Sequence, residues 1–112
     1  MKQIDFLRTF SLSLPEVREE PHFDKTSFRV KKKIFVTYDG THNRACFKFS
    51  ESDQDLFSLI DCSVIYPVPN KWGRQGWTIM EMDRLENQIL QDAAISAYIE
   101  VAPKKLAEMI KR

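Results

Sequence analysis

Basic side chains are concentrated in one short part of this chain of 112 residues, between residues 25 and 48. That stretch has a net charge of +6, because Asp39 is its single acid, whereas the whole chain has a net charge of only +1. Its bases are Lys25, Arg29, Lys31, Lys32, Lys33, Arg44 and Lys48. Lys and Arg attract phosphate groups without regard to base sequence, so the chemistry that this stretch suits is binding of a polyanion.

Alternation of apolar and polar residues predicts that these bases share one face of an antiparallel sheet. Strands are expected over 27–31, 33–38 and 44–49, with a tight turn at Asp39-Gly40. Since side chains alternate along a strand, one face is expected to form the core and the other to be wet. The predicted core face holds Phe28, Val30, Ile34, Val36, Tyr38, Ala45, Phe47 and Phe49, and the predicted wet face holds Arg29, Lys31, Lys33, Phe35, Thr37, Arg44, Cys46 and Lys48.

The predicted wet face is the strongest candidate for a functional surface. Its bases would contact phosphates, and Phe35 among them would stack on an unpaired base. The loop over 70–77 adds Lys71 and Arg74 to the candidate binding residues. The alternative interpretation is a charge-rich face that only keeps the sheet soluble. The pI of about 7.8 favours that alternative, because dedicated nucleic-acid-binding domains usually exceed ~9.

Catalytic and metal-binding motifs are absent from the sequence, and we expect neither an enzyme nor a cofactor. No phosphate-binding glycine loop, HExxH, GxSxG or CxxC motif occurs. His22 beside Asp24 has no nucleophile that sequence can place next to it. The acids Glu51, Asp53 and Asp55 suit the start of a helix rather than a metal loop. Cys46 and Cys62 are expected to be reduced and mostly buried.

The remaining residues predict an α+β fold in one domain, residues 1–112, with helices packed on one face of an antiparallel sheet. The expected order is α-β(3-4)-α-β(2)-α-α. Helices are predicted over 3–13, about 51–62, 85–102 and 103–111, and further strands over 64–66 and 77–82. Residues 16–20 are expected to be extended and to lead into an irregular edge at 21–23. The second helix is expected to bury Leu56, Phe57, Leu59 and Ile60. Because no apolar run is long enough to span a membrane and no signal peptide is evident, we expect a cytoplasmic protein without membrane contact.

Several short motifs, in the right order, resemble those of the MmcQ/YjbR proteins, an uncharacterised bacterial family. They are Leu14-Pro15-Glu16-Val17, Ser27-Phe28-Arg29-Val30, Lys33-Ile34-Phe35-Val36, Asn70-Lys71 followed by Trp77-Thr78-Ile79, and Ser96 to Ala102. The resemblance covers about residues 3–107 and implies an α+β fold similar to secretion chaperones and, distantly, to frataxin-like domains. It also implies DNA binding through a double-wing arrangement of strands, and no catalytic residue. A binding role carried over from the family would fall on Arg29, Lys33 and Lys71.

Two functional hypotheses follow. The first is a non-catalytic DNA-binding domain that uses the basic sheet face. The second is a chaperone-like module that binds another protein and has no nucleic-acid role. The second rests on the fold resemblance, on Phe35 as an exposed aromatic residue, and on the acidic helix opposite the basic face.

Overall fold

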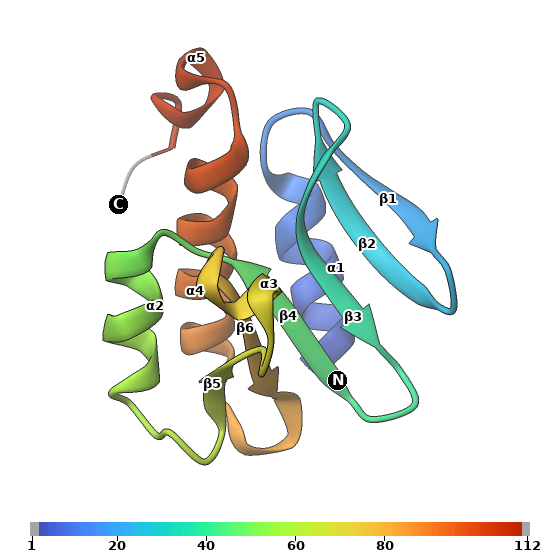
Figure 1. Ribbon diagram of the computed structural model, residues 1–112. Coiled ribbons are helices and arrows are strands. Elements are labelled where there is room, and N and C mark those ends of the chain that lie inside the picture. Colours follow the sequence, from blue (N-terminus) through green and yellow to red (C-terminus); the bar gives the residue numbers. More distant parts are fainter. Residues whose placement is uncertain (1–2, 111–112) are drawn as a thin grey trace.

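The chain forms a six-stranded antiparallel sheet with its two longest helices on one side, which confirms the predicted α+β class (Figure 1). The structure is a computed structural model that describes residues 3–110. Its elements are α1 (Gln3–Ser13), β1 (Val17–His22), β2 (Lys25–Val30), β3 (Lys33–Asp39), β4 (Arg44–Lys48), α2 (Glu51–Ser58), β5 (Ile65–Pro67), α3 (Lys71–Arg74), β6 (Trp77–Glu81), the short 3-10 helix η1 (Met82–Arg84), α4 (Asn87–Val101) and α5 (Lys104–Ala107). Among these described residues, no helix is long and apolar enough to cross a membrane.

The strand order is β1-β2-β3-β4-β6-β5, so the first four strands form consecutive hairpins. The stretch predicted as merely extended before Pro21 is a full strand, β1, which pairs with β2 from Val17 to His22. The β2–β3 turn consists of Lys31 and Lys32, whose φ angles of 49° and 71° are both in the left-handed region. Two-residue hairpin turns of this kind match the twist of the strands that they join.

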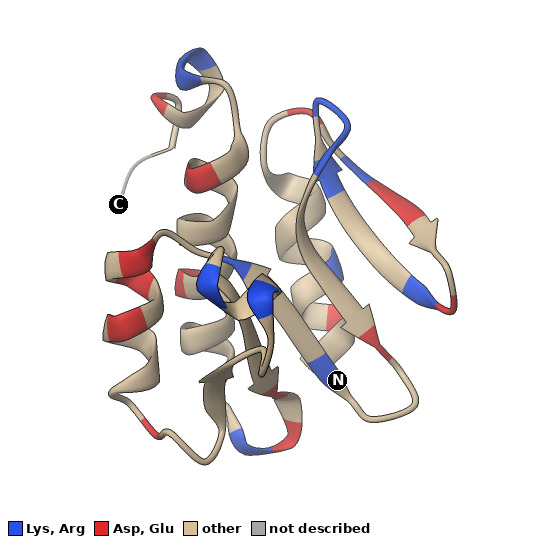
Figure 2. Cartoon of the chain, viewed as in Figure 1, with Lys and Arg blue, Asp and Glu red and all other residues tan. Residues whose placement is uncertain are grey.

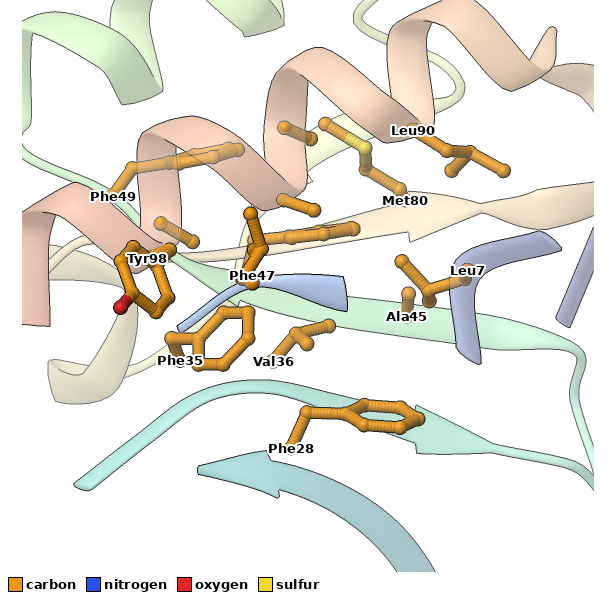
Figure 3. Packing of buried hydrophobic residues seen from close by; sticks show 14 of the residues in the cluster. Leu7, Phe28, Phe35, Val36, Ala45, Phe47, Phe49, Met80, Leu90 and Tyr98 are labelled. Carbon is orange, nitrogen blue, oxygen red and sulfur yellow. The ribbon is translucent and has the colours of Figure 1, made fainter. Parts of the chain in front are cut away.

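The core lies between the sheet and the two helices α1 and α4 (Figures 1 and 3). Phe28, Val36 and Phe47 project from neighbouring strands into it, as the predicted alternation requires. The ring of Tyr98 on α4 meets the ring of Phe35 edge-on, with centroids 5.6 Å apart, and its hydroxyl donates to the Pro15 carbonyl at 2.7 Å. This hydrogen bond ties α4 to the connection between α1 and β1.

The prediction that Phe35 lies on the wet face is wrong, because it is fully buried. The pairing of β2 with β3 shifts register: Phe28 pairs with Val36, whereas the next residue, Arg29, pairs with Ile34. Phe35 is therefore the extra residue of a β-bulge, and it enters the core beside Val36. The shift also pairs Lys33 with Val30, a core residue. Lys33 thus starts β3 on the other side of the sheet from Arg29, and half-buried Ile34 takes an outward position.

Helix α2 also differs from the prediction, since it ends at Ser58 and most of its apolar residues face water. Leu56, Leu59 and Ile60 are 62%, 82% and 52% exposed, and only Phe57 packs inward, with its ring 4.7 Å from that of Phe49. The inward side is taken by Gln54, which donates to the Gly73 carbonyl at 2.8 Å and to the Thr78 hydroxyl at 3.1 Å.

The predictions for the cap of α2, the two cysteines and the last two helices are confirmed in part. Ser50 caps α2 by accepting from the Asp53 amide at 3.1 Å, as its position before the helix indicates. The prediction of mostly buried thiols is wrong for Cys62, which is exposed, while Cys46 is half-buried. Both cysteines are free thiols, as expected. Helices α4 and α5 lie within their predicted ranges but are shorter.

Candidate nucleic-acid interface

The outward face of β4 confirms the alternation that the sequence predicts. Arg44, Cys46 and Lys48 pair with Glu81, Ile79 and Trp77 of β6, while Ala45 and Phe47 between them are fully buried. Arg29 lies on the same side of the sheet, next to Ser27 along β2. Here its Nε atom donates to the Ser27 hydroxyl at 2.9 Å, and its terminal nitrogen donates to the Pro21 carbonyl at 3.3 Å.

The charge of Arg44 is neutralised within the molecule. Its Nε atom lies 2.9 Å from both carboxylate oxygens of Glu81, which also accepts a hydrogen bond from the Tyr66 hydroxyl. Burial acts to raise the pKa of Glu81, but the hydrogen bonds from Tyr66 and Arg44 outweigh burial, so that this pKa lies below its ordinary value. Glu81 is thus ionised at neutral pH, and Arg44 presents little free charge to a ligand.

Lys48, Lys71 and Arg74 form a second group of bases around α3. Lys48 reaches the end of α3, since a Cβ atom built on Gly76, just after that helix, would lie 3.3 Å from the Lys48 Nζ atom. Lys48 also lies 3.7 Å from a carboxylate oxygen of Glu100 on α4. Lys71 and Arg74 are exposed, and Lys71 extends over the ring of Trp72 at 5.6 Å. Figure 2 shows the bases of α3 in front of the sheet, apart from those at the β2–β3 turn.

The third group of bases is at the β2–β3 turn. Lys31, predicted to project from the face of a strand, is instead in the turn, where its Nζ atom lies 2.6 Å from the Glu16 carboxylate. Lys32 and Lys33 are exposed, and neither makes an ion pair with another described residue. The predicted single basic face is therefore divided into three places: Arg44 with Glu81, the group around α3, and the turn with Arg29 beside it.

A concave surface lies at this turn. A cavity of about 710 Å³ is lined by residues of β1, of β2, of the connection before β1 and of the β2–β3 turn. They are Glu16, Val17, Arg18, Glu20, Arg29, Lys31 and Lys32. Four of these are bases and two are acids. Arg18 and Arg29 are directly opposite each other across the β1–β2 pair. We call this set the hairpin cavity.

Two bases of the hairpin cavity, Arg18 and Lys32, are missing from the candidates that the sequence predicts. Arg18 is not a candidate in the sequence, because residues 16–20 are expected only to be extended and to lead into an irregular edge. Its alternation with Val17, a half-buried residue, is the signal that identifies the strand. Lys32 lies between two predicted strands and is not a candidate residue either, although turn residues are the ones most open to a ligand.

No metal centre or activated nucleophile accompanies these bases in the part of the chain that is described. No group of three or more His, Cys, Asp or Glu side chains between residues 3 and 110 is arranged to hold a metal ion. Burial raises the pKa of the Cys46 thiol to about 12, which leaves almost no nucleophilic thiolate at neutral pH. The imidazole Nδ1 atom of His42 lies 2.8 Å from the Asp39 carboxylate, on an exposed turn.

Comparison with known proteins gives a family and a fold. The chain is similar to a crystal structure of the Deinococcus radiodurans protein DR2400, assigned to the domain model DUF419, with a TM-score of 0.78. The two sequences are 22% identical, and the match covers 94% of this chain and 82% of that one, so the likeness extends to the fold alone. A search of curated proteins gave no match. The family model YjbR matches residues 12–112, and the chain therefore belongs to the YjbR family.

Proposed function

We propose that this protein is a non-catalytic nucleic-acid-binding domain that holds the phosphate backbone in the hairpin cavity, and not across the whole outward face of the sheet. The observation that carries this proposal is the concentration of four bases around one concave surface of about 710 Å³. Phosphate contacts position a protein on nucleic acid and supply most of its sequence-independent affinity.

The charges around the cavity differ in how available they are. Lys31 is held by Glu16, whereas Arg18 and Lys32 make no ion pair within residues 3–110. Arg29 is fixed in place by Ser27 and Pro21, with some of its five N–H groups still unused. Because Arg18 and Arg29 are like charges directly opposite each other, their pairing costs stability that a bound anion would return.

The tip of the β1–β2 hairpin offers an aromatic residue in place of Phe35. Phe23 is 93% exposed, and its φ angle of 58° is in the left-handed region, which is unusual for a bulky residue. Its ring meets that of His22 edge-on, with centroids 4.9 Å apart. An exposed ring at the end of a two-stranded ribbon, with Lys25 beside it, suits stacking on an unpaired base.

The test is titration of labelled single-stranded and double-stranded DNA with the wild-type protein and the double variant Arg18→Glu/Lys32→Glu, at about 50 and about 200 mM salt. We expect the wild-type affinity to fall steeply with salt. In the variant, the log–log slope should become shallower by about one unit for each lost phosphate contact.

The matched control is Lys104→Glu/Lys105→Glu, which makes the same charge change on exposed residues of α5. The proposal predicts that this control retains most of the affinity. Equal losses in the two double variants would indicate only a dependence on net charge, and no binding by the wild-type protein at low salt would end the proposal.

A protein-interaction module is the second candidate function. Burial of Phe35 removes one of the arguments that the sequence offers for this function, but the exposed apolar residues of α2 supply another.

A further inference from the structure

The surface of α2 has an apolar patch that the fold leaves uncovered. Leu56, Leu59 and Ile60 are each more than half exposed. Leu59 and Ile60 lie three and four residues after Leu56, so the three side chains are neighbours at the end of α2. Exposed leucines scattered singly need no explanation, but a contiguous apolar patch on a small domain marks a contact surface. We call these three residues the α2 patch.

The patch borders a groove and is not flat. Between α2 and α4 there is a hollow of about 270 Å³, lined by Asp53, Leu56, Phe57, Ile60 and Ser96. The floor is rigid, because Phe57 stacks on Phe49, whose ring in turn stacks on that of Phe47, with centroid separations of 4.7 and 5.7 Å. Gln54 fixes the helix from its inner side through its bonds to Gly73 and Thr78. The groove is thus a preformed receptor for aliphatic side chains.

The charged residues in the segment that contains the α2 patch are all acidic. Residues 49–70 contain Glu51, Asp53, Asp55 and Asp61 and no Lys or Arg, for a net charge of −4. Glu51, Asp55 and Leu59 follow at intervals of four, so the acids continue the line of the patch along the helix. Asp61, at the other end, lies 3.9 Å from Arg84. Figure 2 shows acids on α2 and below it, on the opposite side of the molecule from the β2–β3 turn.

We propose that the groove between α2 and α4 binds a basic amphipathic helix of another protein, which places aliphatic side chains on the α2 patch and its Lys or Arg residues against the acidic rim. Helices bind such grooves through apolar residues one turn apart. The charge argues against the other occupants. Two copies of this chain related by a two-fold axis at the α2 patch would bring acid against acid, and an anionic membrane would be repelled.

The test uses fluorescence anisotropy with a synthetic helical peptide of about 18 residues that has leucines along one face and lysines elsewhere. A second peptide carries glutamate at every lysine position and keeps the leucines. We expect the lysine peptide to bind and the glutamate peptide to bind at least tenfold more weakly. Raising the salt concentration should weaken binding of the lysine peptide, because the rim charges are exposed.

Variants locate the binding site. Leu56→Ser/Leu59→Ser should weaken binding of the lysine peptide at least tenfold. The control Leu12→Ser/Met109→Ser removes exposed apolar residues of similar type elsewhere, 43% and 63% exposed, and should leave binding unchanged. Circular dichroism of each variant checks that the fold is retained, and we expect it to be, because none of the four side chains belongs to the hydrophobic core.

Four results would overturn the proposal: no binding of the lysine peptide, equal binding of the glutamate peptide, equal losses in both double variants, or binding of the α2 patch to zwitterionic lipid vesicles. Light scattering adds a fifth. If the wild-type protein is a dimer that Leu56→Ser/Leu59→Ser converts to a monomer, the occupant of the groove is a second copy of this chain.

Discussion

The hairpin cavity and the α2 patch are both exposed surfaces, but they differ in what their exposure to water costs in free energy. Arg18 and Lys32 around the cavity are well solvated, and their exposure costs the protein little. Leu56 and Leu59 on α2 expose aliphatic surface whose burial would be favourable by about 25 cal/mol per Å². A ligand at the cavity would gain by charge and would be sensitive to salt, whereas a ligand on α2 would gain mainly by excluding water.

The difference shows that exposure has a different meaning for each residue type. A basic surface is compatible with a solvated sheet that has no ligand, so the cavity becomes informative only through its concave shape and its opposed arginines. An apolar surface of three neighbouring residues has no such ordinary explanation. The two surfaces also have opposite charge, so they call for different partners.

The largest expected effect tests whether one side of α2 packs on the core and the other side faces water. Phe49→Ala should destabilise the protein by about 3–5 kcal/mol, because it removes a fully buried ring that stacks on both Phe47 and Phe57. Leu59→Ala should change stability by less than about 0.5 kcal/mol, because Leu59 is 82% exposed. Urea unfolding of both variants measures the contrast. A large loss in Leu59→Ala would mean that the α2 patch is covered in solution.

A smaller effect is expected at the polar contact that holds α2. Gln54→Ala should cost about 1–3 kcal/mol, because it leaves the Gly73 carbonyl and the Thr78 hydroxyl without their buried donor. Gln88→Ala, on the exposed side of α4, serves as the control and should stay within about 0.5 kcal/mol of the wild type. Hydrogen exchange should show faster opening of α2 in Gln54→Ala alone. If α2 exchanges equally in both variants, the helix is held by its apolar contacts and not by Gln54.

The sequence predicts most of the sheet because alternation has a direct physical meaning there. Ala45 and Phe47 point inward while Arg44 and Lys48 point outward, as a period of two requires. The same rule fails at Phe35, since a bulge adds one residue and reverses the side of each residue before it in the strand. Nothing in the local residue types marks this bulge, because Ile34, Phe35 and Val36 are all apolar.

The candidate site was less predictable than the fold. Spacing along a strand places Arg44 on the outward face, but its carboxylate partner is 37 residues away and becomes its neighbour only through the pairing of β4 with β6. In α2, helical spacing identifies an apolar stripe without indicating which side faces the core. The inner side is fixed instead by Gln54, a residue that hydrophobic periodicity counts as polar and exposed.

The next effect separates stability from binding at the tip of the hairpin. Phe23→Asn should raise stability by up to about 1 kcal/mol, because Asn adopts a positive φ more easily and the ring of Phe23 makes few buried contacts. The same change should weaken binding of single-stranded DNA, whereas Phe23→Trp should retain binding. Thermal unfolding and DNA titration of the two variants measure the two properties. If Phe23→Asn binds single strands as well as the wild type, the ring has no stacking role.

The smallest expected effect concerns the ion pair that removes Arg44 from the basic surface. Because the pKa of Glu81 in the folded protein lies below its ordinary value of 4.5, ionised Glu81 stabilises the fold above that pH, and the contribution is lost as the pH falls through the folded pKa. The contribution is less than about 1 kcal/mol, because both side chains are partly exposed. Urea unfolding at about pH 6 and about pH 3 should therefore show a smaller loss of stability in Glu81→Gln than in the wild type. Glu108→Gln makes the same charge change on exposed residues of the C-terminal segment and should follow the wild type.

The same two variants also test DNA binding. In DNA titration at low salt, Glu81→Gln should bind slightly more tightly, because the charge of Arg44 is no longer neutralised. If Glu81→Gln and Glu108→Gln raise the affinity equally, net charge alone accounts for the gain, and the distinction between the hairpin cavity and the rest of the sheet face is lost.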